Sequence, residues 1–459
     1  MEKTKQQEVD LLNSYYSNGS NQILIVYEVI RTGSEDVIRE FVKGKPCLFY
    51  STCSAAERLQ QYIWSKELAK KGFELPEYPT YTQIFEQFEK RAKELDNPVI
   101  VLINDFENIM KNSPDFLSEI SKVVYRDSHP QMMVVLVGSN SAWIENSMVE
   151  KLGSQAQYIS GFLKIKPYTF QEMHKRFMDM PYDDVIRTYS IFGGKALLWD
   201  YFDSKKSFKE NVCDKFLDYQ NSVLLKLTDL MLEENLRETA VYNTILYGLA
   251  NGQNKLNDIH HATGFSRAKI MVYLKSLIEL GVVEKVFSFA TTGHENVQKG
   301  VYRICDGLTG FYFRFLYQHA SNLIRYKPEE FYEKFIEKDI DKFVSYAYKL
   351  VCREYIDKCS SFNKLPFVID EEGEWVGKMG TIDIVAQSDT GDTLVGICDF
   401  EHEFDVTAME QLRNCCKRAR LTPDYYYFFS AVGFDDSLRK LSEEMPEVKL
   451  IGLDELRID

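Results

Sequence analysis

The chain has 459 residues, of which 45% are hydrophobic and 27% are charged, and its formal net charge at pH 7 is -14. This composition is typical of a globular protein, and the length suits about three domains. The negative net charge excludes a protein that coats nucleic acid with its whole surface. A local basic face is still compatible with this net charge.

Apolar runs alternate with helical patterns in the first part of the chain. We expect strands at 22–27, 46–51, 97–105, 131–139 and 161–168. Near-continuous apolar strands separated by helices predict a parallel sheet covered on both faces. Residues 169–236 have a helical pattern, which favours a lid packed on this sheet.

The first strand leads through a short loop into an amphipathic helix that begins near Ser34. Strand, loop and helix in this order are typical of a phosphate-binding loop, which needs glycines, a lysine for the phosphates and a hydroxyl for Mg²⁺. The glycine at Gly33 is present. Glu28 stands at the first glycine position, Ser34 at the lysine position and Glu35 at the hydroxyl position. The arrangement is therefore kept, while its chemistry is replaced.

Residues 237–305 read as three helices followed by two short strands, which predicts a winged helix-turn-helix. This segment has eight Lys or Arg against five Asp or Glu. Arg267, Lys269 and Lys275 lie on or before its third helix, where a DNA reader meets phosphates and guanines. The alternatives are a solvated helix face and a surface for protein contact. We interpret the neighbouring His260 and His261 as exposed or helix-packing residues rather than metal ligands.

The residue pattern of the remaining chain predicts an aromatic-rich helical connection, followed by a last α/β domain. Its expected elements are strands at 381–386, 393–400 and 425–430 and a helix at 409–419. The nine cysteines show no CxxC spacing, and the N-terminal residues lack the apolar core of a signal peptide. We therefore expect reduced thiols in a cytoplasmic protein, and no apolar run is long enough for a membrane span.

With these parts in place, the chain resembles the archaeal-type P-loop ATPases (of AAA or STAND kind) that carry a winged helix and end in domain of unknown function 234. The segments that carry the resemblance are 138–141, 192–194, 240–246, 273–285, 302–304, 352–355 and 382–386. The resemblance implies an α/β fold with a P-loop NTPase-like parallel sheet, a helical lid, a winged helix and a restriction-endonuclease-like C-terminal domain. The expected domains are 1–168, 169–236, 237–305, 306–345 as connecting helices, and 346–459.

The resemblance also implies ATP and Mg²⁺ as cofactors, and here the chain departs from the family. The family's strand-end Asp-Glu pair, which holds Mg²⁺ and polarises the attacking water, is Asn104-Asp105. The family's two arginines align with Ser154 and Gln155. Phosphoryl transfer depends on positive charge around the γ-phosphate, so we expect neither tight Mg-ATP binding nor hydrolysis.

Other positions of the degenerate site are Arg31 in the loop and Ser139 and Asn140 in a sensor-like segment. Ser34 is expected to cap the helix, and the following acids Glu35 and Asp36 are expected to neutralise its dipole from within. The alternative is that these are ordinary first-turn acids. Either interpretation predicts a helix start without a nucleotide.

The C-terminal domain departs in the same way. A nuclease of that fold needs an acid on one strand and an acid-x-lysine on the next. Asp383 fills the first position, but the second motif becomes residues 397–399, which end in Asp399. An alternative is a relocated site with Asp399, Glu401 and Glu403 as the acids and Lys378 or Lys417 as the base.

These readings lead to one functional prediction and one alternative. We predict a non-hydrolysing pseudo-ATPase that acts as a DNA- or protein-binding scaffold, with no metal site. The alternative is an active divergent ATPase, or a Mg²⁺-dependent nuclease whose catalytic residues have moved. The DNA site and the oligomeric state cannot be derived from the residues.

Overall fold

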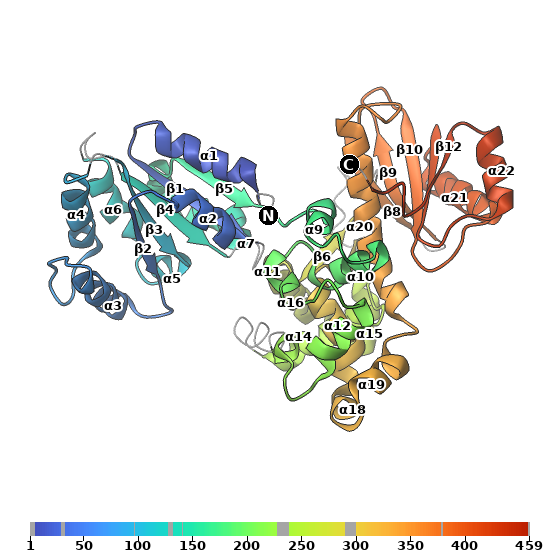
Figure 1. The fold of residues 1–459 in the computed structure, drawn as a ribbon, viewed down its shortest axis with the longest axis horizontal. Coiled ribbons are helices and arrows are strands. Elements are labelled where there is room, and N and C mark those ends of the chain that lie inside the picture. The colour runs from blue at the N-terminus through green and yellow to red at the C-terminus, as the bar shows by residue number, and fades with distance from the viewer. Residues whose placement is uncertain are drawn as a thin grey trace. The chain divides into compact units, whose positions relative to one another are not determined.

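The computed structural model describes residues 5–28, 33–95, 97–126, 132–139, 141–226, 238–289, 300–377 and 380–457. The chain divides into two compact units, Met1–Pro167 and Tyr168–Asp459. Figure 1 shows their elements, and each unit is described by itself. The boundary falls next to the expected end of the first domain, whereas the finer divisions of the second unit stay predictions.

The first unit is built on a five-stranded parallel sheet with the order β2-β3-β4-β1-β5. All five expected strands are present. They are β1 (Gln22–Glu28), β2 (Cys47–Ser51), β3 (Val99–Asn104), β4 (Met132–Gly138) and β5 (Gly161–Ile165). Every residue of β1 and β4 is buried, because both strands are almost wholly apolar and lie inside the sheet.

Helices cover both faces of this sheet, as the sequence predicted. One face packs against α1 (Gln6–Ser17) and α2 (Ser34–Val42). The other face packs against α3 (Glu57–Lys70), α4 (Tyr81–Ala92), α5 (Glu107–Met110) and α6 (Phe116–Val124). The shorter elements are α7 (Ser141–Trp143), a π-helical turn (Ile144–Met148), α8 (Val149–Leu152) and a 3-10 turn (Gly153–Tyr158). The first unit is therefore an α/β domain whose parallel sheet is covered by helices on both faces.

The second unit begins with short helices that we expected to form a lid. They share one hydrophobic core with α20 (Ile340–Ser361) and with one face of the C-terminal sheet. They are α9 (Phe170–Arg176), α10 (Tyr182–Phe192), α11 (Ala196–Trp199), α12 (Phe208–Val212) and a π-helical turn (Cys213–Leu217). α10 also lies close to α17 (Gly307–Phe311), because a Cβ on Gly307 would lie only 2.0 Å from the carbonyl oxygen of Ser190. These helices are therefore integral to the second unit.

Three helices and an antiparallel hairpin follow. They are α14 (Thr239–Ala250), α15 (Leu256–Thr263), α16 (Arg267–Glu279), β6 (Val283–Val286) and β7 (Val301–Ile304), and they enclose a small core of their own. We call this segment the three-helix unit. The connecting helices are α17 (Gly307–Phe311), a π-helical turn (Tyr312–Leu316), a 3-10 turn (Tyr317–His319), α18 (Ala320–Arg325) and α19 (Pro328–Phe335).

The C-terminal part contains a mixed five-stranded sheet with the order β12-β11-β10-β9-β8. Its strands are β8 (Glu371–Gly377), β9 (Gly380–Gln387), β10 (Thr393–Asp399), β11 (Tyr425–Ser430) and β12 (Val448–Ile451). α20 packs on one face, and α21 (Val406–Ala419) and α22 (Asp436–Glu444) pack on the other. The sequence analysis missed β8, β12 and α22. In β8, three of the first four residues are glutamates, which hide the strand pattern.

Two further predictions concern the oxidation state of the cysteines and the presence of membrane-spanning helices. All nine cysteines are free thiols, as expected. Within the described ranges, no helix combines the length and the apolar character that crossing a membrane requires.

Candidate functional site

The degenerate phosphate-binding site lies where three neighbouring strands of the first unit end. β4 lies between β1 and β3, so the carboxyl ends of the three strands meet at one edge of the sheet. Glu28 ends β1, Asn104 ends β3, and Ser139 follows β4. Open parallel sheets bind ligands at this edge. The candidate residues named from the sequence thus lie at one edge of the sheet.

Glu28 closes the start of α2 with its own side chain. Its Oε2 accepts a hydrogen bond from the backbone N–H of Ser34 at 2.8 Å, and its Oε1 accepts one from the Ser34 hydroxyl at 2.6 Å. Both residues are buried, with 9% and 4% of their surface exposed. A helix N-terminus has unpaired N–H groups and partial positive charge, which attract an anion. That anion is here a carboxylate of the chain.

One detail of the sequence interpretation is wrong. Gly33, with φ of 117° and ψ of 23°, is the N-cap of α2, and Ser34 is already the first helical residue. Ser34 therefore does not cap the helix, and its hydroxyl donates to Glu28 instead. Glycine suits the cap position because φ is positive there. The expected self-neutralisation of the helix start is present, but it comes from Glu28 across the loop.

Further carboxylates surround this closed helix start. Burial raises the pKa of Asp105, and the neighbouring charges of Glu35 and Glu28 raise it further. Asp105 has φ of 53°, and its Oδ2 accepts a hydrogen bond from the Asn104 side chain at 2.9 Å. Like charges placed together in this way disfavour an anionic ligand. The Asn104-Asp105 pair thus stabilises a strand-end turn.

The sensor-like segment has a carboxylate partner as well. Glu107 is buried, and its Oε1 accepts a hydrogen bond from the backbone N–H of Ser139 at 2.8 Å. Gln155, at one position of the family's arginines, accepts from the Ser118 N–H and donates to the Pro114 carbonyl oxygen. Two predicted site residues, Arg31 and Asn140, lie outside the described residues.

These contacts test whether a nucleotide fits. A triphosphate needs the N–H groups at the helix start and a cation beside its oxygens. The Ser34 N–H is taken by Glu28, and the charges acting on Asp105 are those of Glu35 and Glu28. The residues at this edge, as far as the structure describes them, do not fit Mg-ATP.

The cations predicted to meet DNA lie on the exposed face of α16. Arg267 donates to the Asn257 side chain at 2.7 Å, and the Lys269 ammonium lies 4.9 Å from the centre of the Phe265 ring. The Lys275 side chain is 79% exposed, with its ammonium 3.9 Å from the Glu279 carboxylate. All three cations thus lie on one helix and reach solvent.

The two histidines behave as expected for packing residues. Nδ1 of His260 is 2.7 Å from the carbonyl oxygen of Phe265, a contact that joins α15 to the following turn. In the part of the chain that the structure describes, no group of three or more His, Cys, Asp or Glu side chains could hold a metal ion.

The nuclease-like acid of the C-terminal sheet is held by a lysine that the sequence analysis missed. Lys349 on α20 places its ammonium 2.7 Å from Asp383 Oδ1 on β9 and 3.2 Å from Glu374 Oε2 on β8. The other oxygen of Asp383 accepts the N–H of Cys398 at 3.0 Å. The Thr381 hydroxyl also donates to Oδ1, at 3.3 Å, so both oxygens of the Asp383 carboxylate are engaged within the protein.

The relocated acidic cluster does not join this group. Asp399 Oδ1 accepts hydrogen bonds from the backbone N–H groups of Glu401 and His402, at 2.7 and 2.9 Å, so it shapes the turn after β10. Lys417 lies in the last turn of α21. Lys378 lies outside the described residues. The lysine beside Asp383 comes from α20. The only sign of it in the sequence is a polar residue within an otherwise apolar face of that helix.

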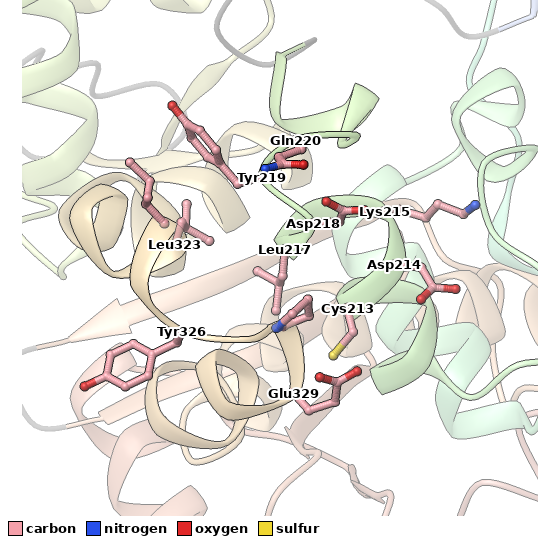
Figure 2. A pocket seen from close by; sticks show the side chains of 12 residues that line it. Cys213, Asp214, Lys215, Leu217, Asp218, Tyr219, Gln220, Leu323, Tyr326 and Glu329 are labelled. Carbon is pink, nitrogen blue, oxygen red and sulfur yellow. The ribbon is translucent and has the colours of Figure 1, made fainter.

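A cavity of about 570 Å³ lies elsewhere in the second unit. Leu217 and Cys213 line its centre, and Glu329 lies on one side of it (Figure 2). None of its lining residues is a predicted site residue. It is open and mixed in polarity, so it indicates no particular ligand.

Comparison with known proteins confirms the expected resemblance. Residues 312–410 match the profile of DUF234, described as archaea bacterial proteins of unknown function. An uncharacterized protein of Methanocaldococcus jannaschii is 24% identical over 405 residues, which cover 84% of each chain.

Two solved structures are similar to parts of this chain, both with TM-scores below 0.5. The Walker-type ATPase of Pyrococcus abyssi has a TM-score of 0.47 at 14% identity, covering 68% of this chain and 95% of its own. The ORC2 protein of Aeropyrum pernix, in ADPNP-ADP complexes, has a TM-score of 0.44 at 13% identity, covering 70% of this chain and 94% of its own.

Proposed function

We propose that this chain, which combines a P-loop NTPase-like domain with a DUF234 segment, is a non-hydrolysing scaffold that binds duplex DNA through the three-helix unit. The first half of the proposal, that the scaffold does not hydrolyse nucleotide, rests on the two hydrogen bonds between Glu28 and Ser34. The site that would receive phosphate is filled by a carboxylate. The protein then needs no nucleotide to hold its first unit in one conformation.

The electrostatics support this proposal. A carboxylate that accepts backbone N–H groups at a helix start stabilises the helix in the way a bound phosphate would. A triphosphate entering here would have to displace Glu28 and lie close to Asp105 and Glu35. Both steps cost free energy, and Ser34 offers no cation in return. The loss of Mg²⁺-binding charge at Asn104 acts in the same direction.

Isothermal titration of the full chain with Mg-ATP tests the proposal. We expect no binding below a Kd of about 1 mM, which corresponds to about 4 kcal/mol of binding free energy. The double variant Glu28→Gly/Ser34→Lys frees the helix start and adds a cation, and we expect it to bind ATP measurably. Glu40→Gln, at the other end of α2, is the matched control. Micromolar binding by the unmodified protein, or phosphate release above background, would overturn the proposal.

The exposed face of α16 supports the second half. Arg267, Lys269 and Lys275 lie on a helix that packs as the third of three before a hairpin. Val272 lies between the lysines and is 65% exposed, which suits contact with a thymine methyl group. The cations would meet phosphates or guanines.

Fluorescence anisotropy with a labelled duplex at several salt concentrations tests DNA binding. Each lost phosphate contact reduces the slope of log K against log salt by about 0.9. We expect the triple variant Arg267→Ala/Lys269→Ala/Lys275→Ala to lose about two to three such units. Lys440→Ala on α22 is the control. Equal binding by the triple variant and the control would exclude α16 as the DNA surface. No binding by the unmodified chain would leave a protein partner as the ligand of this face. Nicking of plasmid DNA by the unmodified chain would favour the nuclease alternative.

A further inference from the structure

A line of alternating charges runs from the hairpin of the three-helix unit to the C-terminal sheet. Arg303 on β7 pairs with Glu284 on β6. The same guanidinium donates two hydrogen bonds to Glu374 on β8, at 2.6 and 3.3 Å. Glu374 meets Lys349 on α20, and Lys349 meets Asp383 on β9. We call these five residues the ion chain. It connects four strands and one helix that are distant in sequence.

The middle of the ion chain is buried. The side chains of Lys349, Glu374 and Asp383 are 15%, 5% and 11% exposed. Burial by itself would lower the pKa of Lys349, but Asp383 and Glu374 raise it above its usual value. Burial would likewise raise the pKa of Glu374, whereas Arg303 and Lys349 hold it below its usual range. Lys349 and Glu374 therefore stay charged around neutral pH.

A divalent ion does not fit between these carboxylates. Mg²⁺ needs oxygens that are free to approach to about 2.1 Å. Asp383 uses one oxygen for Lys349 and the other for the Cys398 N–H. Glu374 uses both oxygens for Arg303 and one of them also for Lys349. The position between the two carboxylates is occupied by the ammonium group of Lys349.

The ion chain lies beside a second connection between hairpin and sheet. The chain leaving β6 runs along β8, the edge strand of the C-terminal sheet. The Phe289 N–H donates to the Glu374 carbonyl oxygen at 2.7 Å, and the Ser288 hydroxyl both accepts from and donates to the Val376 backbone. The Phe289 side chain is buried in the core under α21. Polar and apolar contacts thus hold the same joint.

We propose that Lys349 is a built-in cation of the C-terminal domain, which replaces a divalent metal ion between Asp383 and Glu374 and fastens the hairpin of the three-helix unit to the C-terminal sheet. The nuclease-like acid then has a structural role. The exposed face of α16 and the C-terminal sheet move as one body, and this body forms without metal. Removing one member of the ion chain leaves its neighbours charged and buried without compensation, which is strongly unfavourable.

The variant Lys349→Met keeps most of the length of the side chain and removes its charge. We expect its Tm to fall by about 10 °C, because the buried Asp383 loses its ammonium partner while Glu374 keeps Arg303. Hydrogen exchange followed by mass spectrometry should become faster at both ends of the joint, residues 283–289 and 371–377. Lys358→Met is the matched control, since that lysine lies on the same helix but is 30% exposed and 4.0 Å from its partner Glu354. The double variant Lys349→Met/Asp383→Asn should recover part of the lost Tm, and it is informative if the single variant folds poorly.

Metal ions give the second measurement. We expect EDTA, Mg²⁺ and Mn²⁺ to leave the Tm of the unmodified chain unchanged. The variant Lys349→Ala opens space between the two carboxylates, so Mn²⁺ should raise the Tm of this variant. The proposal is overturned if Lys349→Met matches the Lys358→Met control in Tm and hydrogen exchange. It is also overturned if EDTA or Mn²⁺ shifts the Tm of the unmodified chain.

Discussion

At two places, the start of α2 and the C-terminal ion chain, a side chain of the protein supplies the charge that a ligand would otherwise supply. At α2 the carboxylate of Glu28 lies where a phosphate would accept N–H groups. In the C-terminal sheet the ammonium of Lys349 lies between the carboxylates of Asp383 and Glu374, where we propose that it replaces a metal ion. Both substitutions satisfy groups that would otherwise be left unpaired.

The two places differ in the distance along the chain that they bridge. Glu28 and Ser34 are 6 residues apart, on a strand and the helix that follows it. Lys349 and Glu374 are 25 residues apart, and their partners extend to Arg303 on the hairpin. A local closure removes a ligand site and adds little to tertiary stability. A closure between distant elements becomes part of what holds them together.

The largest effect should come from the distant closure. Asp383→Asn leaves Lys349 with one carboxylate, so we expect the free energy of unfolding to fall by about 3 kcal/mol. Urea unfolding of the full chain measures this. Asp399→Asn is the control, because the Asp399 side chain at the end of β10 is 29% exposed, and its replacement should cost less than about 1 kcal/mol. Equal losses in both variants would show that the ion chain has no special weight.

The local closure should cost less. Glu28→Ala removes two hydrogen bonds at the start of α2 and also relieves repulsion from Asp105, so we expect a loss of about 1 kcal/mol. Thermal unfolding at pH 7 measures it, with Glu35→Ala, an exposed neighbour on the same helix, as the control. A loss as large as that of Asp383→Asn would remove the contrast between the two places.

A like-charge contact near the ion chain gives a pH-dependent test. Burial and the neighbouring Glu372 raise the pKa of Asp357 on α20 to about 7. Between about pH 4 and 7 the folded chain holds a proton that the unfolded chain has released, so stability falls as pH rises. Asp357→Asn should therefore gain about 1 kcal/mol above pH 7, a value reduced for solvent screening, and nothing below pH 4. Asp389→Asn on an exposed turn is the control. A gain that is independent of pH would contradict this explanation.

The smallest effect belongs to the first place. Asp105 has a raised pKa from burial and from Glu35 and Glu28, so its ionised form costs stability above that pKa. Asparagine tolerates the positive φ of this position. We expect Asp105→Asn to gain about 0.5 kcal/mol at pH 8 and to gain nothing at pH 4, as measured by urea unfolding. Asp115→Asn, on an exposed helix start, should change neither value.

Much of the fold followed from periodicity. The apolar runs predicted all five strands of the first unit, because strands buried on both faces need continuous apolar residues. The same logic failed at β8, where glutamates mask the pattern. Those glutamates are compatible with a strand only because Arg303, Lys349 and Arg353 neutralise them from other elements. A sequence pattern contains no information about such distant partners.

The candidate site was predictable to a similar extent. The residue types at Glu28, Ser34, Asn104 and 397–399 by themselves predicted that phosphate and metal chemistry had been replaced. Which side chains meet was decided by tertiary structure, since the Glu28 carboxylate accepts the N–H at the helix start, and the ammonium of Lys349, a residue of α20, meets Asp383. The physical reason is that charge type is local to a residue, whereas desolvation and pairing depend on what the fold brings within about 3 Å.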